Sequence, residues 1–137
     1  MNFPEVARGM ILLSLLYLVL GFSFGGLILS HKGAPLHPAV WRLLPAHVDF
    51  LLLGWLTQLT LAAAYWIFPR FPTPPQRGSA LRHGLEIATF NLGLWITALS
   101  PLFSNPNWLT LIGRTLQTAG LALFSLDLWR RIRPYQR

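Results

Sequence analysis

The sequence predicts an all-α protein, an integral membrane four-helix bundle whose helices run up, down, up and down. Of the 137 residues, 53% are hydrophobic and only 11% are charged, whereas soluble domains carry about 25% charged residues. A chain this short cannot bury so much apolar surface in one soluble core. Four apolar runs are each long enough to cross a bilayer core of about 30 Å, which needs roughly 20 helical residues.

Each apolar run is expected to form a helix, because backbone inside lipid must satisfy its own hydrogen bonds. We expect helices over residues 9–30, 46–68, 85–103 and 108–129, within one transmembrane domain that spans residues 1–137. The first run lacks a small-residue cleavage site, so we interpret it as a retained helix and not a signal peptide. The connections are short and rich in proline, which favours antiparallel packing of consecutive helices.

The basic residues predict the orientation of this bundle. The net charge of +7 could indicate nucleic acid, but the basic side chains flank apolar runs and do not line one polar face, so no nucleic-acid partner is expected. At the end that would hold both termini lie Arg8, Arg70, Arg77, Arg82, Arg130, Arg131, Arg133 and Arg137. The other end has Lys32 and Arg42. This excess predicts a multi-pass protein of the inner (cytoplasmic) membrane with both termini in the cytoplasm.

Ionisable residues inside a membrane are costly and are therefore candidates for function. Glu86, in the first turn of the third helix, and Asp127 should lie near the cytoplasmic surface, where Asp127 can pair with Arg130 and Arg131. We interpret them as an interfacial ion-pair cluster, and a role in proton entry stays open. His83 is expected to be an interface residue that reaches toward water.

Counted from Pro106, Arg114 lies about 12 Å along the fourth helix, at 1.5 Å per residue, and should reach toward the outer third of the membrane. Asp49 should lie on the same outer side, close to the start of the second helix. The two residues could form an ion pair inside the bundle. Alternatively, Arg114 could face an anionic group of a bound cofactor or lipid.

His47 follows Pro45, which suits the first helical position, and so opens the second helix on the outer side. The residues that should share its helical face are Leu51, Gly54, Gln58 and Tyr65. Gly54 removes bulk below the imidazole, which leaves room for a flat ligand or for close helix packing. In the first helix, the GxxxG pattern from Gly21 to Gly25 predicts a packing notch, within the bundle or between protomers.

Two further histidines, His31 and His37, fall on the same outer side as His47. Their spacing lacks the i, i+4 pattern that places two metal ligands on one helix face. A metal site built from the three histidines is therefore the weakest of the open interpretations. The sequence shows no nucleophile beside a base and no glycine-rich phosphate loop, so we assign no catalytic residue.

The stretch "HVDFLLLGWLTQLTLAAAYWIFPR" resembles helix II of the catalytic subunit of heme–copper oxidases, especially nitric oxide reductases and cbb-type oxidases. The shared pattern is a histidine, a run of leucines, a small–aromatic step, and an aromatic pair followed by proline. The runs "LLYLVLGFSFGGLIL", "FNLGLWITAL" and "LQTAGLALFSLDLWRRIRP" are similar to helices I, III and IV of that subunit. The resemblance therefore implies a small four-helix relative of the oxidase subunit.

The resemblance implies that His47 is an axial ligand of heme b, with Gly54 on its face and Arg114 near a propionate. The second ligand would be His31, His37 or a histidine of a second protomer. The ligands of the heme–copper centre come from later helices that this chain lacks, so no oxygen or nitric oxide reduction is expected from it alone. The implied roles are respiratory electron transfer, gas sensing or heme handling.

A second reading is that the chain keeps this fold without a cofactor. It would then be a non-catalytic accessory or assembly subunit of a nitric oxide reductase or terminal oxidase, with Asp49 and Arg114 paired. In both readings the lipid bilayer surrounds the protein. We expect either a homo-oligomer or docking on a larger respiratory membrane complex.

Overall fold

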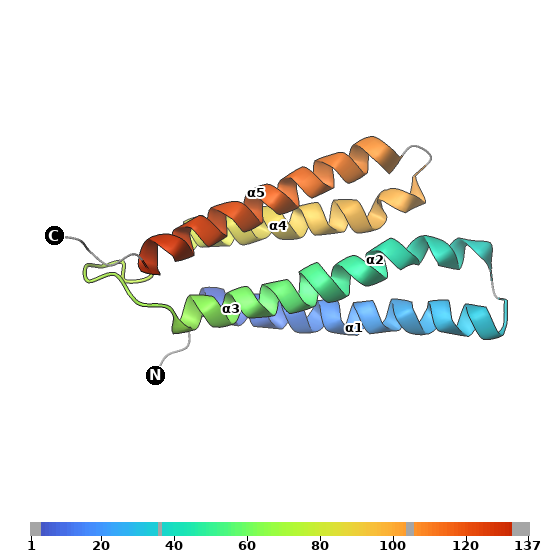
Figure 1. The fold of residues 1–137 in the computed structure, drawn as a ribbon, viewed down its shortest axis with the longest axis horizontal. Helices are drawn as coiled ribbons and strands as arrows, with labels where there is room; N and C mark the ends of the chain where they lie inside the picture. The colour runs from blue at the N-terminus through green and yellow to red at the C-terminus, as the bar shows by residue number, and fades with distance from the viewer. Residues whose placement is uncertain (1–3, 36, 104–105, 133–137) are drawn as a thin grey trace.

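The computed structural model describes residues 4–35, 37–103 and 106–132, and these form four long helical segments (Figure 1). The first is α1 (Glu5–Gly33). The second runs through η1 (Pro38–Leu43), α2 (Leu44–Asp49), η2 (Phe50–Thr57) and α3 (Gln58–Ile67). The third is α4 (Ala80–Leu99) with η3 (Ser100–Leu102), and the fourth is α5 (Pro106–Ile132). All four segments are long and apolar enough to cross a membrane, so the chain is a multi-pass membrane protein.

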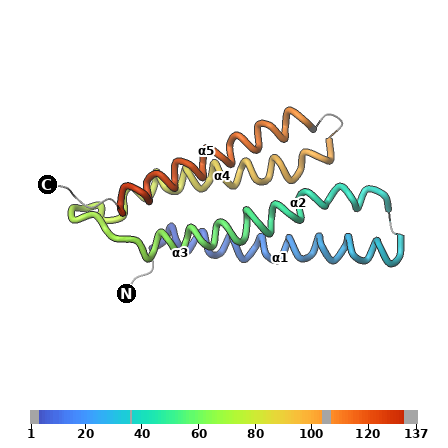
Figure 2. Tube along the Cα trace, viewed as in Figure 1, coloured from blue at the N-terminus to red at the C-terminus, as the bar shows by residue number. Residues whose placement is uncertain are grey.

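The helices form two antiparallel hairpins (Figure 2). One hairpin pairs α1 with the α2–α3 segment, and the other pairs α4 with α5. Residues 68–79 join the hairpins at the end where the described chain also starts and stops. We call this the basic end, because the described cations there are Arg8, Arg70, Arg77, Arg82, Arg130 and Arg131. The opposite end carries Lys32 and Arg42, whereas Arg133 and Arg137 lie outside the described residues. The predicted up-down-up-down order is confirmed, as is the charge asymmetry over the described residues.

The helices extend beyond the predicted boundaries. At 1.5 Å per residue, the 29 residues of α1 measure about 43 Å, which exceeds a bilayer core of about 30 Å. The start of α4 lies five residues earlier than predicted, because Ser79 caps it by accepting a hydrogen bond from the Arg82 backbone N–H at 3.4 Å. Glu86 therefore lies in the second turn of this helix, and its placement in the first turn was wrong.

The second segment is not the uniform α-helix that the sequence predicted. It begins as a 3₁₀ helix at Pro38, becomes α-helical at Leu44 and widens into a π-helix over Phe50–Thr57. A side-chain hydrogen bond follows the same five-residue spacing, since the Thr57 hydroxyl donates to the Leu52 carbonyl at 2.8 Å. Such π segments are rare and often occur beside functional positions. Here it follows directly after His47 and Asp49.

Two hydrophobic clusters fill the bundle. Near the basic end, Met10, Tyr65 and Phe124 pack together, and further along Tyr17, Phe50 and Leu94 do so. Glycines allow the α4–α5 hairpin to close, because a Cβ on Gly120 would lie 2.6 Å from the backbone of Phe90. Close backbone approach at small residues is the usual way in which membrane helices associate.

Candidate functional site

His47 lies at the opposite end, on α2, and its imidazole packs against α1. Its Nδ1 lies 2.7 Å from the Gly21 carbonyl oxygen, and a carbonyl can only accept, so Nδ1 carries the hydrogen. In the neutral ring, Nε2 then keeps its lone pair. A Cβ on Gly25 would lie 2.6 Å from His47 Cε1, so the GxxxG notch accommodates the imidazole. The predicted packing notch is therefore confirmed within the bundle.

Leu51, Gly54 and Gln58 of the predicted His47 face contact α1, whereas Tyr65 packs against His83 and Phe124. Leu51 fills the space at Gly21, and Gln58 Nε2 donates to the Met10 carbonyl at 3.3 Å. A Cβ on Gly54 would lie 2.5 Å from the ring of Tyr17. Of the two uses considered for Gly54, the structure thus shows close helix packing against Tyr17.

Asp49 and Arg114 form the ion pair that the sequence suggested. One guanidinium nitrogen, Nη2 of Arg114, lies 3.0 Å from both carboxylate oxygens of Asp49. Arg114 Nη1 also donates to the Gln117 side-chain oxygen at 3.0 Å, and Gln117 in turn donates to Thr97 at 3.3 Å. Asp49 is buried, whereas the Arg114 side chain remains 44% exposed. The pair joins the two hairpins near the opposite end.

The other two outer histidines make separate contacts. His31 lies edge-on to Trp41, with ring centroids 6.0 Å apart. His37 is exposed and caps η1, since its Nδ1 accepts a hydrogen bond from the Ala39 backbone at 3.1 Å. In the described part of the chain, the one group of three neighbouring metal-ligating side chains lies at the other end of the bundle. The structure does not bring His31, His37 and His47 together as a metal site.

At the basic end, His83, Glu86 and Asp127 are buried together, with donor atoms within 4.8 Å of one another. Arg82 bridges the two acids, at 3.1 Å from Glu86 and 2.7 Å from Asp127. Arg130 adds a longer contact with Asp127 at 3.4 Å. The sequence predicted the ion-pair cluster and its Asp127–Arg130 contact, and both are confirmed.

Two parts of the prediction at the basic end were wrong. His83 is only 2% exposed and does not reach toward water. Arg131 does not pair with Asp127; its guanidinium donates to the carbonyls of Tyr65, Phe68 and Pro69 at 3.1, 2.8 and 2.9 Å. Arg131 therefore satisfies the open carbonyls at the end of α3. The sequence of α5 alone does not indicate this role.

The contacts of His83 define its hydrogen-bonding state. Nδ1 lies 3.1 Å from a Glu86 carboxylate oxygen, and Nε2 lies 3.0 Å from the Arg77 carbonyl oxygen. A carboxylate and a carbonyl both accept only, so this geometry places a hydrogen on each ring nitrogen. Both nitrogens of His83 and both carboxylates are therefore already engaged. A metal ion would have to displace Arg82 and the ring hydrogens.

No protein-family model, curated protein or solved structure that was compared with the chain matches it. The resemblance to the oxidase subunit therefore rests on the quoted residues. His47 lies within the membrane-spanning segment Pro38–Ile67, toward the end opposite both ends of the described chain.

Proposed function

We propose that the protein lies in the cytoplasmic membrane with both termini in the cytoplasm and binds heme b through His47. The observation that carries this proposal is the hydrogen bond from His47 Nδ1 to the Gly21 carbonyl. It leaves the lone pair on Nε2 and fixes the ring, which is the usual arrangement of a metal-binding imidazole. The likeness of residues 47–70 to helix II of the oxidase subunit supports the same assignment.

The His47 ring is half-buried against α1, and a side chain at Gly25 would lie 3.4 Å from its Nε2. Gly26 beside it faces open space. Arg114 is exposed enough to meet a propionate while it holds Asp49. Because His31 and His37 contact Trp41 and Ala39, a histidine of a second protomer is the better source of a second ligand.

Bound heme would supply one-electron chemistry or gas binding, tuned by the axial ligand and the polarity of its surroundings. The chain would hold the iron, orient the imidazole through Gly21 and limit access of water. These roles suit electron transfer, gas sensing or heme handling. One histidine cannot build a heme–copper centre, so we propose no enzyme activity for the chain alone.

A second candidate function is that of an accessory or assembly subunit of a nitric oxide reductase or terminal oxidase, without its own cofactor. The observation that favours it is the Asp49–Arg114 pair, which is complete within the chain and needs no ligand. Exposed apolar side chains such as Leu29 and Leu111 would then contact lipid or the larger complex.

A visible spectrum of the detergent-purified protein, oxidised and dithionite-reduced, separates these two functions. Heme binding predicts a Soret band with sharp reduced α and β bands, lost in His47→Ala. His37→Ala is the matched control, because His37 is an exposed histidine at the same end, and it should keep the bands. A colourless protein from heme-replete cells would exclude heme, and bands that survive His47→Ala would exclude His47 as the ligand.

A further inference from the structure

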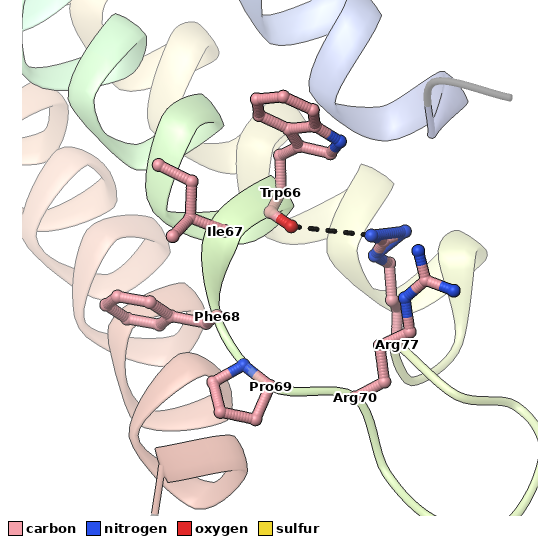
Figure 3. A pocket seen from close by; sticks show the side chains of 6 residues that line it. All are labelled: Trp66, Ile67, Phe68, Pro69, Arg70 and Arg77. Atoms are coloured by element: carbon pink, nitrogen blue, oxygen red, sulfur yellow. Dashed lines mark hydrogen bonds between the residues drawn. The ribbon is translucent and has the colours of Figure 1, made fainter. Parts of the chain in front are cut away.

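An open pocket of about 390 Å³ lies at the basic end, where α3 ends and the connection to α4 begins (Figure 3). Its walls come from two kinds of residue, apolar side chains and guanidinium groups. The residues that line it are Trp66, Ile67, Phe68, Pro69, Arg70 and Arg77. In Figure 3 the two arginines share one side of the pocket, across from Ile67 and Phe68.

The two pocket arginines have no anionic partner among the described residues. Arg70 is exposed and makes no ion pair or hydrogen bond in this part of the structure. Arg77 donates one long hydrogen bond, 3.4 Å, to the Trp66 carbonyl, and its Nε is buried without a partner. Arg131 lies close enough for its guanidinium group to be repelled by the charges of Arg70 and Arg77. An anion in the pocket would therefore relieve repulsion among these guanidinium groups.

The described acids of the basic end form no ion pair with Arg70 or Arg77, and this includes Glu5, which is exposed at the start of α1. Glu86 and Asp127 are held by Arg82, Arg130 and His83 in the buried cluster. Among the described residues, the positive charge of the pocket is thus not neutralised by a carboxylate.

The apolar side of the pocket points to the kind of anion. Ile67 is 70% exposed and Trp66 43% exposed at the last turn of a membrane-spanning segment. A tryptophan at this level is typical of the lipid headgroup region. Basic pockets at the cytoplasmic end of membrane helices bind anionic headgroups. A free phosphate would use only the arginines, whereas a lipid would use both sides of the pocket.

We propose that this pocket binds one anionic phospholipid of the phosphatidylglycerol type, with its phosphate on Arg70 and Arg77 and its acyl chains along Trp66 and Ile67. The site is separate from His47 and does not depend on heme. It would anchor the loop between the two hairpins to the membrane surface, at the point where Arg131 also closes α3.

Native mass spectrometry of the detergent-solubilised protein, titrated with dioleoyl phosphatidylglycerol, tests the proposal. One lipid should bind in preference to dioleoyl phosphatidylcholine, and an excess of inorganic phosphate should not displace it. Arg70→Gln with Arg77→Gln should weaken binding about 30-fold, from roughly 1 kcal/mol for each arginine. Arg70→Gln alone should weaken it about fivefold, and it should keep the fold because Arg70 is exposed and makes no hydrogen bond to another described residue.

The matched control is Arg8→Gln with Arg42→Gln, which removes two exposed charges outside the pocket. It should leave binding within about twofold of the unaltered protein. Equal loss in this control would assign binding to general surface charge and overturn the site. Equal binding of both lipids, displacement by phosphate, or unchanged binding in Arg70→Gln would each overturn it as well.

Discussion

At the opposite end of the bundle, Asp49 meets a single guanidinium, that of Arg114. At the basic end, Asp127 lies 2.7 Å from Arg82, 3.4 Å from Arg130 and 3.9 Å from His83. The first carboxylate joins one hairpin to the other, while the second joins α4 to α5 within a hairpin. Buried charge therefore has two roles here, one between the hairpins and one within a hairpin. Removing one member of the cluster at the basic end should lower the free energy of unfolding more than removing one member of the Asp49–Arg114 pair.

The basic end also carries the strongest contact between the hairpins. Arg131 of α5 is only 5% exposed and closes the last turn of α3 through three carbonyls. The corresponding link at the opposite end, through Arg114, has one partner in the other hairpin, Asp49. The hairpins should therefore separate first at the opposite end.

The largest effect is expected for Arg131→Met. It leaves the carbonyls of Tyr65, Phe68 and Pro69 without their donor and should lower the free energy of unfolding by about 3 kcal/mol. Arg130→Met is the matched control, because Arg130 is exposed and makes one long ion pair; it should cost less than about 1 kcal/mol. Unfolding by sodium dodecyl sulfate in micelles measures both. Equal losses would contradict the assigned role of Arg131.

The second prediction compares the two carboxylates directly. Asp127→Asn removes the partner of Arg82, Arg130 and His83 and should cost about 2 to 3 kcal/mol, less than a fully buried pair because Arg82 is half exposed. Asp49→Asn leaves Arg114 with Gln117 and water, and should cost about 1 kcal/mol. The same unfolding titration measures both variants. A larger loss for Asp49→Asn would reverse the ranking of the two ends.

The fold and one of these charge arrangements could be predicted from the sequence. Four apolar runs and the basic flanks are enough for the bundle, because bilayer thickness fixes the length of a spanning helix. Depth made the Asp49–Arg114 pair one of two interpretations, since a rise of 1.5 Å per residue brings both residues to the same level. The GxxxG pattern of the first helix also predicts a packing notch from the local sequence, because small residues at this spacing let helices approach closely.

The buried cluster at the basic end could not be predicted in full, because it depends on the register of α4 against α5. His83 and Glu86 are neighbours on one helix, but the bridge from Arg82 to Asp127 spans 45 residues. Asp127 has arginines three and four residues later, and helical spacing alone does not choose between them. Arg131 instead donates hydrogen bonds to the open carbonyls at the end of α3, which leaves Arg130 as the partner of Asp127.

A glycine pair on α1 tests how tightly the opposite end is packed. Gly25→Ala places a Cβ 2.6 Å from His47 Cε1, so the ring must shift and weaken its hydrogen bond to Gly21, at a cost of about 1 to 2 kcal/mol. Gly26→Ala meets open space and should be neutral or stabilising by up to about 1 kcal/mol through helix propensity. Thermal unfolding in detergent distinguishes them. Similar stability of the two variants would show that the His47 contact with α1 is loose.

The smallest effects are expected at the caps that start a helix at each end. Ser79→Ala removes the acceptor for the Arg82 backbone N–H at the start of α4, at a cost of about 0.5 to 1 kcal/mol. His37→Ala removes the acceptor for Ala39 at the start of the short η1 and should cost no more than about 0.5 kcal/mol, since an exposed N–H can bond to water instead. Amide hydrogen exchange at Arg82 and at Ala39 resolves differences this small.

Faster exchange at Arg82 in Ser79→Ala, with the Arg82–Asp127 bridge retained, would show that the cap sets the start of α4 while the cluster holds the turn above it. Unchanged exchange would instead assign the early start of α4 to the buried cluster alone.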